Sequence, residues 1–224
     1  MKKFKRCPKP LSWYIAVVIS FPLLLCLISC KRTQPQAAPV TRANPKAKRW
    51  LGDFGRVEGT QYLSAEIRSR PYESGSFLES EFKTGKLHNY AFFDTISEST
   101  ERLLPTNDYV IISTWRYPEL KEGEKTGLPV KWFLYSLVKR DTNGDKDMTS
   151  EDKQTLALSD FNGKNYVEVL ADVEGIFGQS QRDSETLIIF YNQAARKYDA
   201  VVDLPHKKLL TTKELPSLGD DVQQ

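Results

Sequence analysis

The chain has 224 residues, with 32 basic and 29 acidic side chains, a formal net charge of +3 and three cysteines. That length suits one domain with extensions. The charge is unevenly distributed, because residues 1–29 hold five basic residues and residues 31–49 hold six, with no acid in either segment. From Trp50 onward, 21 basic residues stand against 29 acidic ones, without a basic stripe. We therefore exclude nucleic acid as a partner of the folded part.

The N-terminus has the form of an export signal. Its basic residues all precede an apolar run over residues 11–29, LSWYIAVVISFPLLLCLIS, and this order is what the export machinery reads. The run ends in Leu27-Ile28-Ser29-Cys30, which resembles the lipobox of bacterial lipoproteins. The resemblance implies that residues 1–29 are a signal peptide, cleaved before Cys30, and that Cys30 carries covalent lipid.

An uncleaved transmembrane anchor is the alternative reading of this segment. A bilayer is spanned by about 20 apolar residues, and the run is close to that length. Pro22 within it and the cysteine at its end favour the lipoprotein. Both readings place the domain outside the cytoplasm. Cleavage would remove Cys7 and Cys26, which leaves no thiol for a disulfide.

A flexible tether is predicted over residues 30–49, where Pro, Ala and basic residues occur without apolar periodicity. Each of its charges would be attracted to an anionic lipid surface by about 1 kcal/mol. Lys31 stands where inner-membrane lipoproteins of enteric-type bacteria carry an aspartate, so the resemblance implies the periplasmic face of the outer membrane rather than the inner membrane. Residues 217–224 are expected to form a loose tail.

Residues 50–216 are predicted to form one all-β domain of antiparallel hairpins. The strand-like segments are rich in Val, Ile, Tyr and Phe, and turn residues separate them. They are Tyr62–Ser69, Phe77–Phe82, Asn89–Thr95, Tyr109–Trp115, Lys131–Val138, Thr155–Ser159, Tyr166–Leu170, Thr186–Asn192 and Tyr198–Leu204.

An internal repeat refines this prediction. Three segments share a strand that ends in aspartate, a turn and a second strand: NYAFFD-TISEST-ERLL, TLALSD-FNGKN-YVEVL and YDAVVD-LPHKK-LLTTKEL. Their aspartates, Asp94, Asp160 and Asp203, are 66 and 43 residues apart. A period of about 40–45 residues is typical of four-stranded propeller blades. The segment 156–165, LALSDFNGKN, resembles the blade hairpin of TolB-like propellers. Since a closed propeller needs at least four blades, we expect an incomplete propeller-like or a sandwich-like sheet arrangement.

One segment, residues 141–152, resembles the calcium loop of EF-hands and dockerins. Calcium takes six or more oxygen ligands, which such a loop supplies from positions 1, 3, 5, 7, 9 and 12. The resemblance implies side-chain ligands at most of these positions, a backbone carbonyl from the seventh, and an apolar Met148 that ties the loop to the core. The implied ligands are Asp141, Asn143, Asp145, Asp147, Thr149 and Asp152.

The loop departs from its families at two positions. Lys146 occupies the sixth, where φ is positive and glycine is usual, which costs about 1 kcal/mol. Asp152 replaces the glutamate of EF-hands at the twelfth position. Strands, not helices, are predicted on both sides. We therefore expect a weak, structural calcium site that staples a hairpin, with an acidic solvated turn as the alternative.

The remaining features favour binding over catalysis. His88 and His206 are interpreted as surface residues on hairpins, and aromatic residues on the strands as core, or alternatively as a strip that binds sugar or peptide. The leading hypothesis is a membrane-held, non-enzymatic binding or scaffold module. It would contact a protein partner or a second copy at open sheet edges. The alternatives are an envelope hydrolase with two facing carboxylates that acts on glycan or peptide, and a calcium-responsive sensor.

Overall fold

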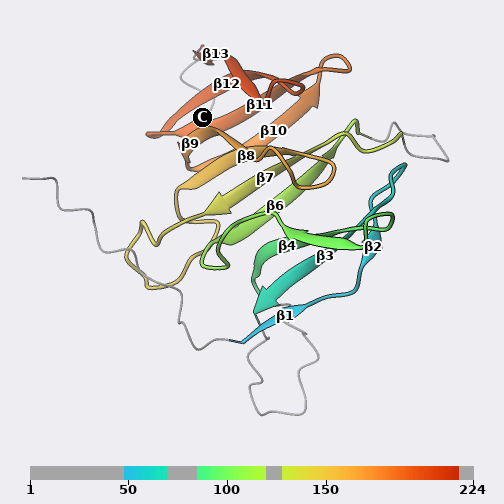
Figure 1. Ribbon diagram of the computed structural model, residues 1–224. Coiled ribbons are helices and arrows are strands. Elements are labelled where there is room, and N and C mark those ends of the chain that lie inside the picture. Colours follow the sequence, from blue (N-terminus) through green and yellow to red (C-terminus); the bar gives the residue numbers. More distant parts are fainter. Residues whose placement is uncertain (1–47, 70–84, 120–127, 217–224) are drawn as a thin grey trace, which may run out of the picture. The chain divides into compact units, whose positions relative to one another are not determined.

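The computed structural model describes residues 48–69, 85–119 and 128–216 (Figure 1). Cys30, the segment 1–29, nearly all of the tether, the predicted strand Phe77–Phe82 and the tail 217–224 lie outside them. The described residues form thirteen strands and no helix, so the all-β prediction is confirmed. None of the described segments is a helix long and apolar enough to span a bilayer.

The strands are numbered in chain order. They are β1 (Arg49–Leu51), β2 (Gly55–Arg56), β3 (Tyr62–Ser69), β4 (Leu87–Asp94), β5 (Ser99–Arg102), β6 (Val110–Tyr117), β7 (Trp132–Val138), β8 (Gln154–Asp160), β9 (Val167–Val173), β10 (Gly175–Gln181), β11 (Thr186–Gln193), β12 (Arg196–Asp203) and β13 (Lys208–Glu214).

Hydrogen bonding divides the strands into two antiparallel sheets. The larger has the order β1-β3-β4-β6-β7-β8-β9, with β2 on β3 and β5 on β4, and the smaller is the meander β10-β11-β12-β13. The larger sheet is itself two groups, because β4 and β6 pair only at Leu87 and Ile111. We call β1–β5, β6–β9 and β10–β13 the first, second and third blade-like units. Figure 1 shows the third unit in orange and red. The arrangement is an incomplete, propeller-like one, as expected.

The predicted repeat corresponds to the last hairpin of each unit. Asp94, Asp160 and Asp203 end β4, β8 and β12, the second-to-last strand of each unit, and each of these strands pairs with the last strand of its unit. In each turn the chain takes a left-handed residue with φ between 51° and 54°, four or five positions after the aspartate. Those residues are Glu98, Asn165 and Lys207. An alanine also stands three positions before each aspartate, namely Ala91, Ala157 and Ala200, and all three are buried.

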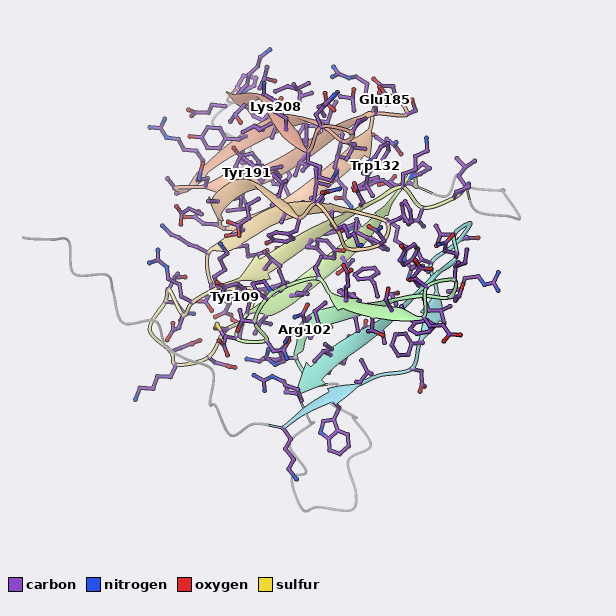
Figure 2. All side chains as sticks on the ribbon, in the orientation of Figure 1. Arg102, Tyr109, Trp132, Glu185, Tyr191 and Lys208 are labelled. Atoms are coloured by element: carbon purple, nitrogen blue, oxygen red, sulfur yellow. The ribbon has the colours of Figure 1, made fainter. Side chains whose placement is uncertain are left out.

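Two apolar cores lie between successive units. The first joins β4 of the first unit to β7 and β8 of the second, through Phe92, Phe133 and Tyr135 among others. The second core joins the opposite face of β7 and β8 to β11 and β12, and contains Trp132 and Tyr191 (Figure 2). Strand β7 is buried at every position, which explains why its sequence, WFLYSLV, is apolar on both faces.

Most predicted strands are confirmed, and β3 has the predicted bounds. Strand β10 was missed, since its sequence GIFGQSQ contains two glycines that weaken the strand signal. The short β1 and β2 were missed as well. The interpretation of His88 as a surface residue was wrong: it lies in β4 with 3% of its surface exposed, whereas His206 is exposed in the turn after β12.

Candidate functional site

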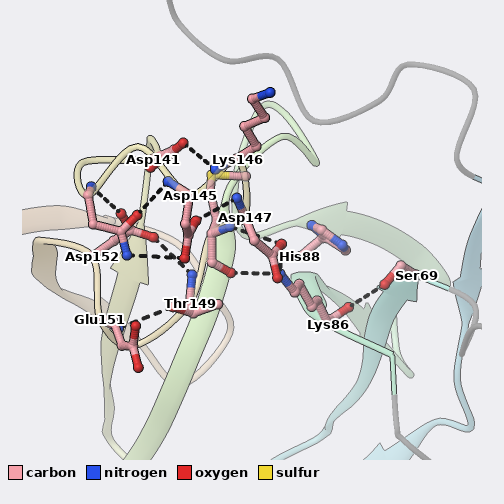
Figure 3. Close-up of polar contacts among 12 residues, drawn as sticks. Ser69, Lys86, His88, Asp141, Asp145, Lys146, Asp147, Thr149, Glu151 and Asp152 are labelled. Atoms are coloured by element: carbon pink, nitrogen blue, oxygen red, sulfur yellow. Dashed lines mark hydrogen bonds and ion pairs between the residues drawn. The ribbon is translucent and has the colours of Figure 1, made fainter.

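The loop 141–152 connects β7 to β8 and is wound by its own hydrogen bonds (Figure 3). Asp141 accepts the N–H of Gly144 at 2.6 Å and that of Lys146 at 2.8 Å. Asn143 Oδ1 accepts the N–H of Asp145, whose Oδ1 accepts that of Asp147. Each oxygen-bearing side chain thus folds the next part of the loop around itself.

Lys146 has a φ of +71°, as the sixth position of a calcium loop requires. An L-residue there is strained by about 1 kcal/mol. The N–H of Lys146 is nevertheless held by Asp141, so the loop keeps this winding despite the lysine.

Asp152 closes the loop and is fully buried. Its Oδ1 accepts the N–H of Thr142 at 2.5 Å and that of Asn143 at 3.2 Å, and its Oδ2 accepts that of Thr149 at 3.0 Å. Burial raises the pKa of Asp152, but these hydrogen bonds outweigh it, so the pKa is lowered overall. The carboxylate is therefore ionised and ties the two ends of the loop together.

The loop is also attached to its surroundings. Met148 is 8% exposed and packs with Val110 and Val138, the place that the calcium-loop resemblance implied for it. Lys86, which precedes β4, forms an ion pair with Asp147 and donates to the Met148 carbonyl at 2.9 Å (Figure 3). The first and second units are thus linked at this loop.

The donor set of the loop suits a hard cation, because all of its side-chain donors are oxygens. The described residues nonetheless contain no three His, Cys, Asp or Glu side chains grouped closely enough to hold a metal ion. The loop oxygens accept backbone N–H groups instead. Calcium would be held by Asp141, Asn143, Asp145, Thr149, Asp152 and the carbonyl of Asp147 only after some of these contacts rearranged.

A second candidate site is a groove of about 310 Å³ between the first and second units. One wall comes from β3 and β4 and the other from β6 and β7. Its floor is aromatic: Tyr90 lies 6.1 Å from Tyr135 and Phe92 lies 5.9 Å from Phe133, between ring centroids. These four residues are among the strand aromatic residues that the sequence analysis interpreted as core or, alternatively, as a strip that binds sugar or peptide.

Polar groups are placed along the groove. Tyr90 donates its hydroxyl hydrogen to Thr114 Oγ1 at 3.2 Å, and burial raises the pKa of Tyr90. Arg68 pairs with Glu66 at 2.5 Å on the wall from β3. Arg116 lies on the β6 wall, is exposed, and has no ion pair with any residue that the structure describes. Two guanidinium groups against one carboxylate leave the groove with an excess of positive charge.

Sequence reasoning did not identify this groove. Arg68 and Arg116 are far apart along the chain, and alternation places them on the same side as the aromatic residues only once the pairing of β3 with β4 and of β6 with β7 is known. The signal within the sequence was an aromatic residue at every second position, Tyr90 and Phe92 on β4 and Phe133 and Tyr135 on β7.

Comparisons with known proteins add a fold likeness. No family model matches the chain, and no curated protein matches it. A solved structure that it resembles is the β-propeller domain of the trilobed protease from Pyrococcus furiosus, described as having an open velcro topology. The match has a TM-score of 0.37 and 11% identity, and covers 76% of this chain and 44% of that one. The chain therefore spans less than half of that structure's length.

Proposed function

We propose that this protein is a lipid-anchored, non-enzymatic binding module of the cell envelope, which holds an extended acidic segment of a protein partner in the groove between its first and second units. The anchor rests on the export signal and on Leu27-Ile28-Ser29-Cys30. Lipid on Cys30 and the basic tether would together hold the domain at a membrane, since one acyl chain alone binds only marginally. The periplasmic face of the outer membrane is the expected location.

The observation that carries the binding role is the groove with an open strand edge beside it. Strand β6 pairs along its length with β7, but on its other side it meets β4 only at Ile111. Further along β6, Ile112, Ser113, Thr114 and Arg116 line the groove. An exposed edge is a template for an added strand, whose main chain supplies affinity while side-chain pockets supply specificity.

The charged and aromatic side chains of the groove indicate which kind of partner segment it would bind. Arg116 is unpaired with described residues and Arg68 shares Glu66, so carboxylates of a bound strand would find two guanidinium groups. The aromatic floor would take the alternate, apolar side chains of the same strand, since successive side chains point to opposite faces. An acidic strand with alternating apolar residues fits both features.

Calcium has a structural part in this proposal. The loop 141–152 joins β7 to β8, so a cation held by its oxygens would stiffen the hairpin that forms one wall of the groove. Without a cation the aspartates of the loop repel one another. We propose a staple rather than a sensor, because Met148 and Lys86 already attach the loop to both units.

The hydrolase alternative finds no support in the described residues. Two facing carboxylates are needed for that chemistry. Three hollows lined by described residues each contain a single carboxylate: Glu66, Asp160 and Glu101 respectively. We therefore propose no second function.

The groove is tested with full-length protein in detergent and two blocked, fluorescein-labelled octapeptides. One alternates Glu with Val and the other alternates Lys with Val. Fluorescence anisotropy should show binding of the Glu peptide, weakened about tenfold by Arg116→Ala, which corresponds to about 1.4 kcal/mol. Arg182→Ala, an exposed arginine in the β10–β11 turn, is the matched control. Equal binding of both peptides, or no effect of Arg116→Ala, would overturn the proposal.

The anchor is tested separately by labelling cells with radioactive palmitate. The wild-type chain should incorporate label and run at the mass of a cleaved form, and Cys30→Ala should do neither. A Cys30→Ala chain that incorporates label would contradict the lipid site. A wild-type chain that stays membrane-bound at its uncleaved mass would identify the segment as a transmembrane anchor instead.

A further inference from the structure

The repeat imposes a rule on which face of each unit meets its neighbour. Ala157, three residues before Asp160, lies in the core shared with the first unit. Leu156 and Leu158, on the alternate positions of the same strand, lie in the core shared with the third unit. Odd positions before the aspartate thus face the preceding unit, and even positions face the following one.

The other two units obey the same rule near their aspartates; in β4 it ends at the β-bulge opposite Ile67 and Arg68, beyond which Leu87, at an odd position, lies in the core shared with the second unit. Ala200 and Val202, at odd positions before Asp203, lie in the core shared with the second unit. Phe92, at an even position before Asp94, lies in the core shared with the second unit as well. Each unit therefore has one face for its predecessor and one for its successor.

Among the described residues the third unit has no successor, and its successor face carries a group of apolar side chains beside the polar Asp199 and Lys213. Val201 lies at an even position before Asp203 and pairs with Ile188 across the strands, and both are only half-buried. Beside them Phe177 is 46% exposed, with its ring centroid 6.1 Å from that of Phe190. Leu210 on β13 is 50% exposed.

No described strand precedes the first unit, and its predecessor face is apolar too. Ala91 and Phe93 are at odd positions before Asp94, and Phe93 pairs with Leu63 across the strands. Phe54 lies edge-on to Phe93 with ring centroids 6.0 Å apart, and is 39% exposed. The described part of the chain thus has a predecessor face left over on its first unit and a successor face left over on its third unit.

We propose that these two faces bind each other between two copies of the chain, so that two sets of three units close into a ring of six. Within this protein, the successor face of one unit packs on the predecessor face of the next. The first unit carries a predecessor face on which no described unit packs. The three units that the structure describes are too few to close on themselves, because propellers need at least four blades. A twofold pair buries both end faces of both copies in two equivalent head-to-tail contacts.

Two charge-introducing substitutions test this contact. Phe177→Glu disables the successor face, and Phe54→Glu disables the predecessor face. Val167→Glu, at an exposed valine of β9 outside both faces, is the matched control. Mass is measured by sedimentation velocity of full-length protein in density-matched detergent. Wild type and the control should have twice the mass of one chain, and each of the other two variants alone should have the mass of one.

Mixing the two variants distinguishes a head-to-tail ring from other dimers. In a pair of one Phe177→Glu chain and one Phe54→Glu chain, both substitutions fall in the same contact and the other contact is unaltered. Equimolar mixing should therefore restore a dimer that is weaker than the wild-type dimer. A dimer that survives Phe54→Glu would instead be a symmetric pair of third units. Wild-type monomers, a mixture that stays monomeric, or open chains longer than two would each overturn the proposal.

Folding is checked in the same samples by near-ultraviolet circular dichroism. Phe54 contacts Phe93, so Leu51→Glu, at a 56% exposed residue of β1, replaces Phe54→Glu if that variant loses its signal. The ring does not depend on the groove proposal, because neither Phe54 nor Phe177 lines the groove.

Discussion

Lys207 Nζ lies 2.5 Å from Asp160 Oδ1 and joins equivalent turns of the third and second units. Asp160 is the repeat aspartate of the second unit, and Lys207 is the left-handed residue of the third turn, with a φ of +51°. The lysine side chain is 8% exposed and that of the aspartate 26%. Lys164 in the second turn likewise pairs with Glu101 of the first unit, so cations link each turn to the preceding unit.

Replacement of Lys207 by methionine should destabilise the protein. Removal of one partner from a fully buried ion pair costs about 3–5 kcal/mol. Because Asp160 is partly exposed and keeps a 2.6 Å hydrogen bond from Asn165, we expect a loss of about 1–3 kcal/mol in the free energy of unfolding. Urea unfolding measures it, with Lys208→Met at the exposed neighbour as control. Equal effects of the two substitutions would show that the ion pair contributes nothing.

Gly163 and Gly175 should respond in opposite ways to alanine. Gly163 has a φ of +77°, and a Cβ there would lie 2.4 Å from Phe92 Cδ2, in the core between the first and second units. Gly163→Ala should therefore lower the free energy of unfolding by about 2 kcal/mol or more. Gly175 has neither a positive φ nor any atom near its Cβ position, so alanine there should be neutral or stabilise by up to about 1 kcal/mol. Similar losses in urea unfolding would refute the contact with Phe92.

Local pattern was enough to predict the fold class, the repeat and most strands, because each hairpin has its own alternation and turn residues. The three aspartates at the strand ends were found in this way. The groove was not, since it depends on how β4 and β6 diverge after Leu87 and Ile111, a long-range relationship. His88 was misjudged because burial of a polar residue depends on the partner that satisfies it, here the Tyr109 carbonyl, 21 positions away.

Calcium should stabilise the protein through the loop 141–152. With a dissociation constant on the order of 1 mM, as in extracellular modules, 10 mM calcium would add about 1.4 kcal/mol of stability. That corresponds to a rise of about 3–4 °C in Tm for a domain of this size. Thermal unfolding should show the rise in wild type and in Asp183→Asn, an exposed turn aspartate, but not in Asp145→Asn. An equal rise in all three would indicate non-specific binding.

His88 should make the protein less stable in mild acid. Its pKa is lowered from 6.5 to about 4, mainly by burial and further by the positive charges of Arg49 and Lys86. The Tyr109 carbonyl, which accepts a hydrogen bond from Nδ1 at 2.7 Å, raises the pKa but does not outweigh these effects. Because the folded pKa lies below the unfolded one, the unfolded state binds more protons between these values. The stabilisation is complete above pH 6.5 and is lost as the pH falls toward 4.

The loss should reach about 2–3 kcal/mol in the free energy of unfolding at pH 4.5 relative to pH 7, from 1.36 kcal/mol per pKa unit. Urea unfolding at the two pH values measures it. His88→Gln keeps a donor for the Tyr109 carbonyl but does not titrate, so the difference should shrink by most of this amount. His206→Gln, at the exposed histidine, should leave it unchanged. An undiminished difference in His88→Gln would assign the acid sensitivity to other groups, such as the carboxylates of the loop 141–152.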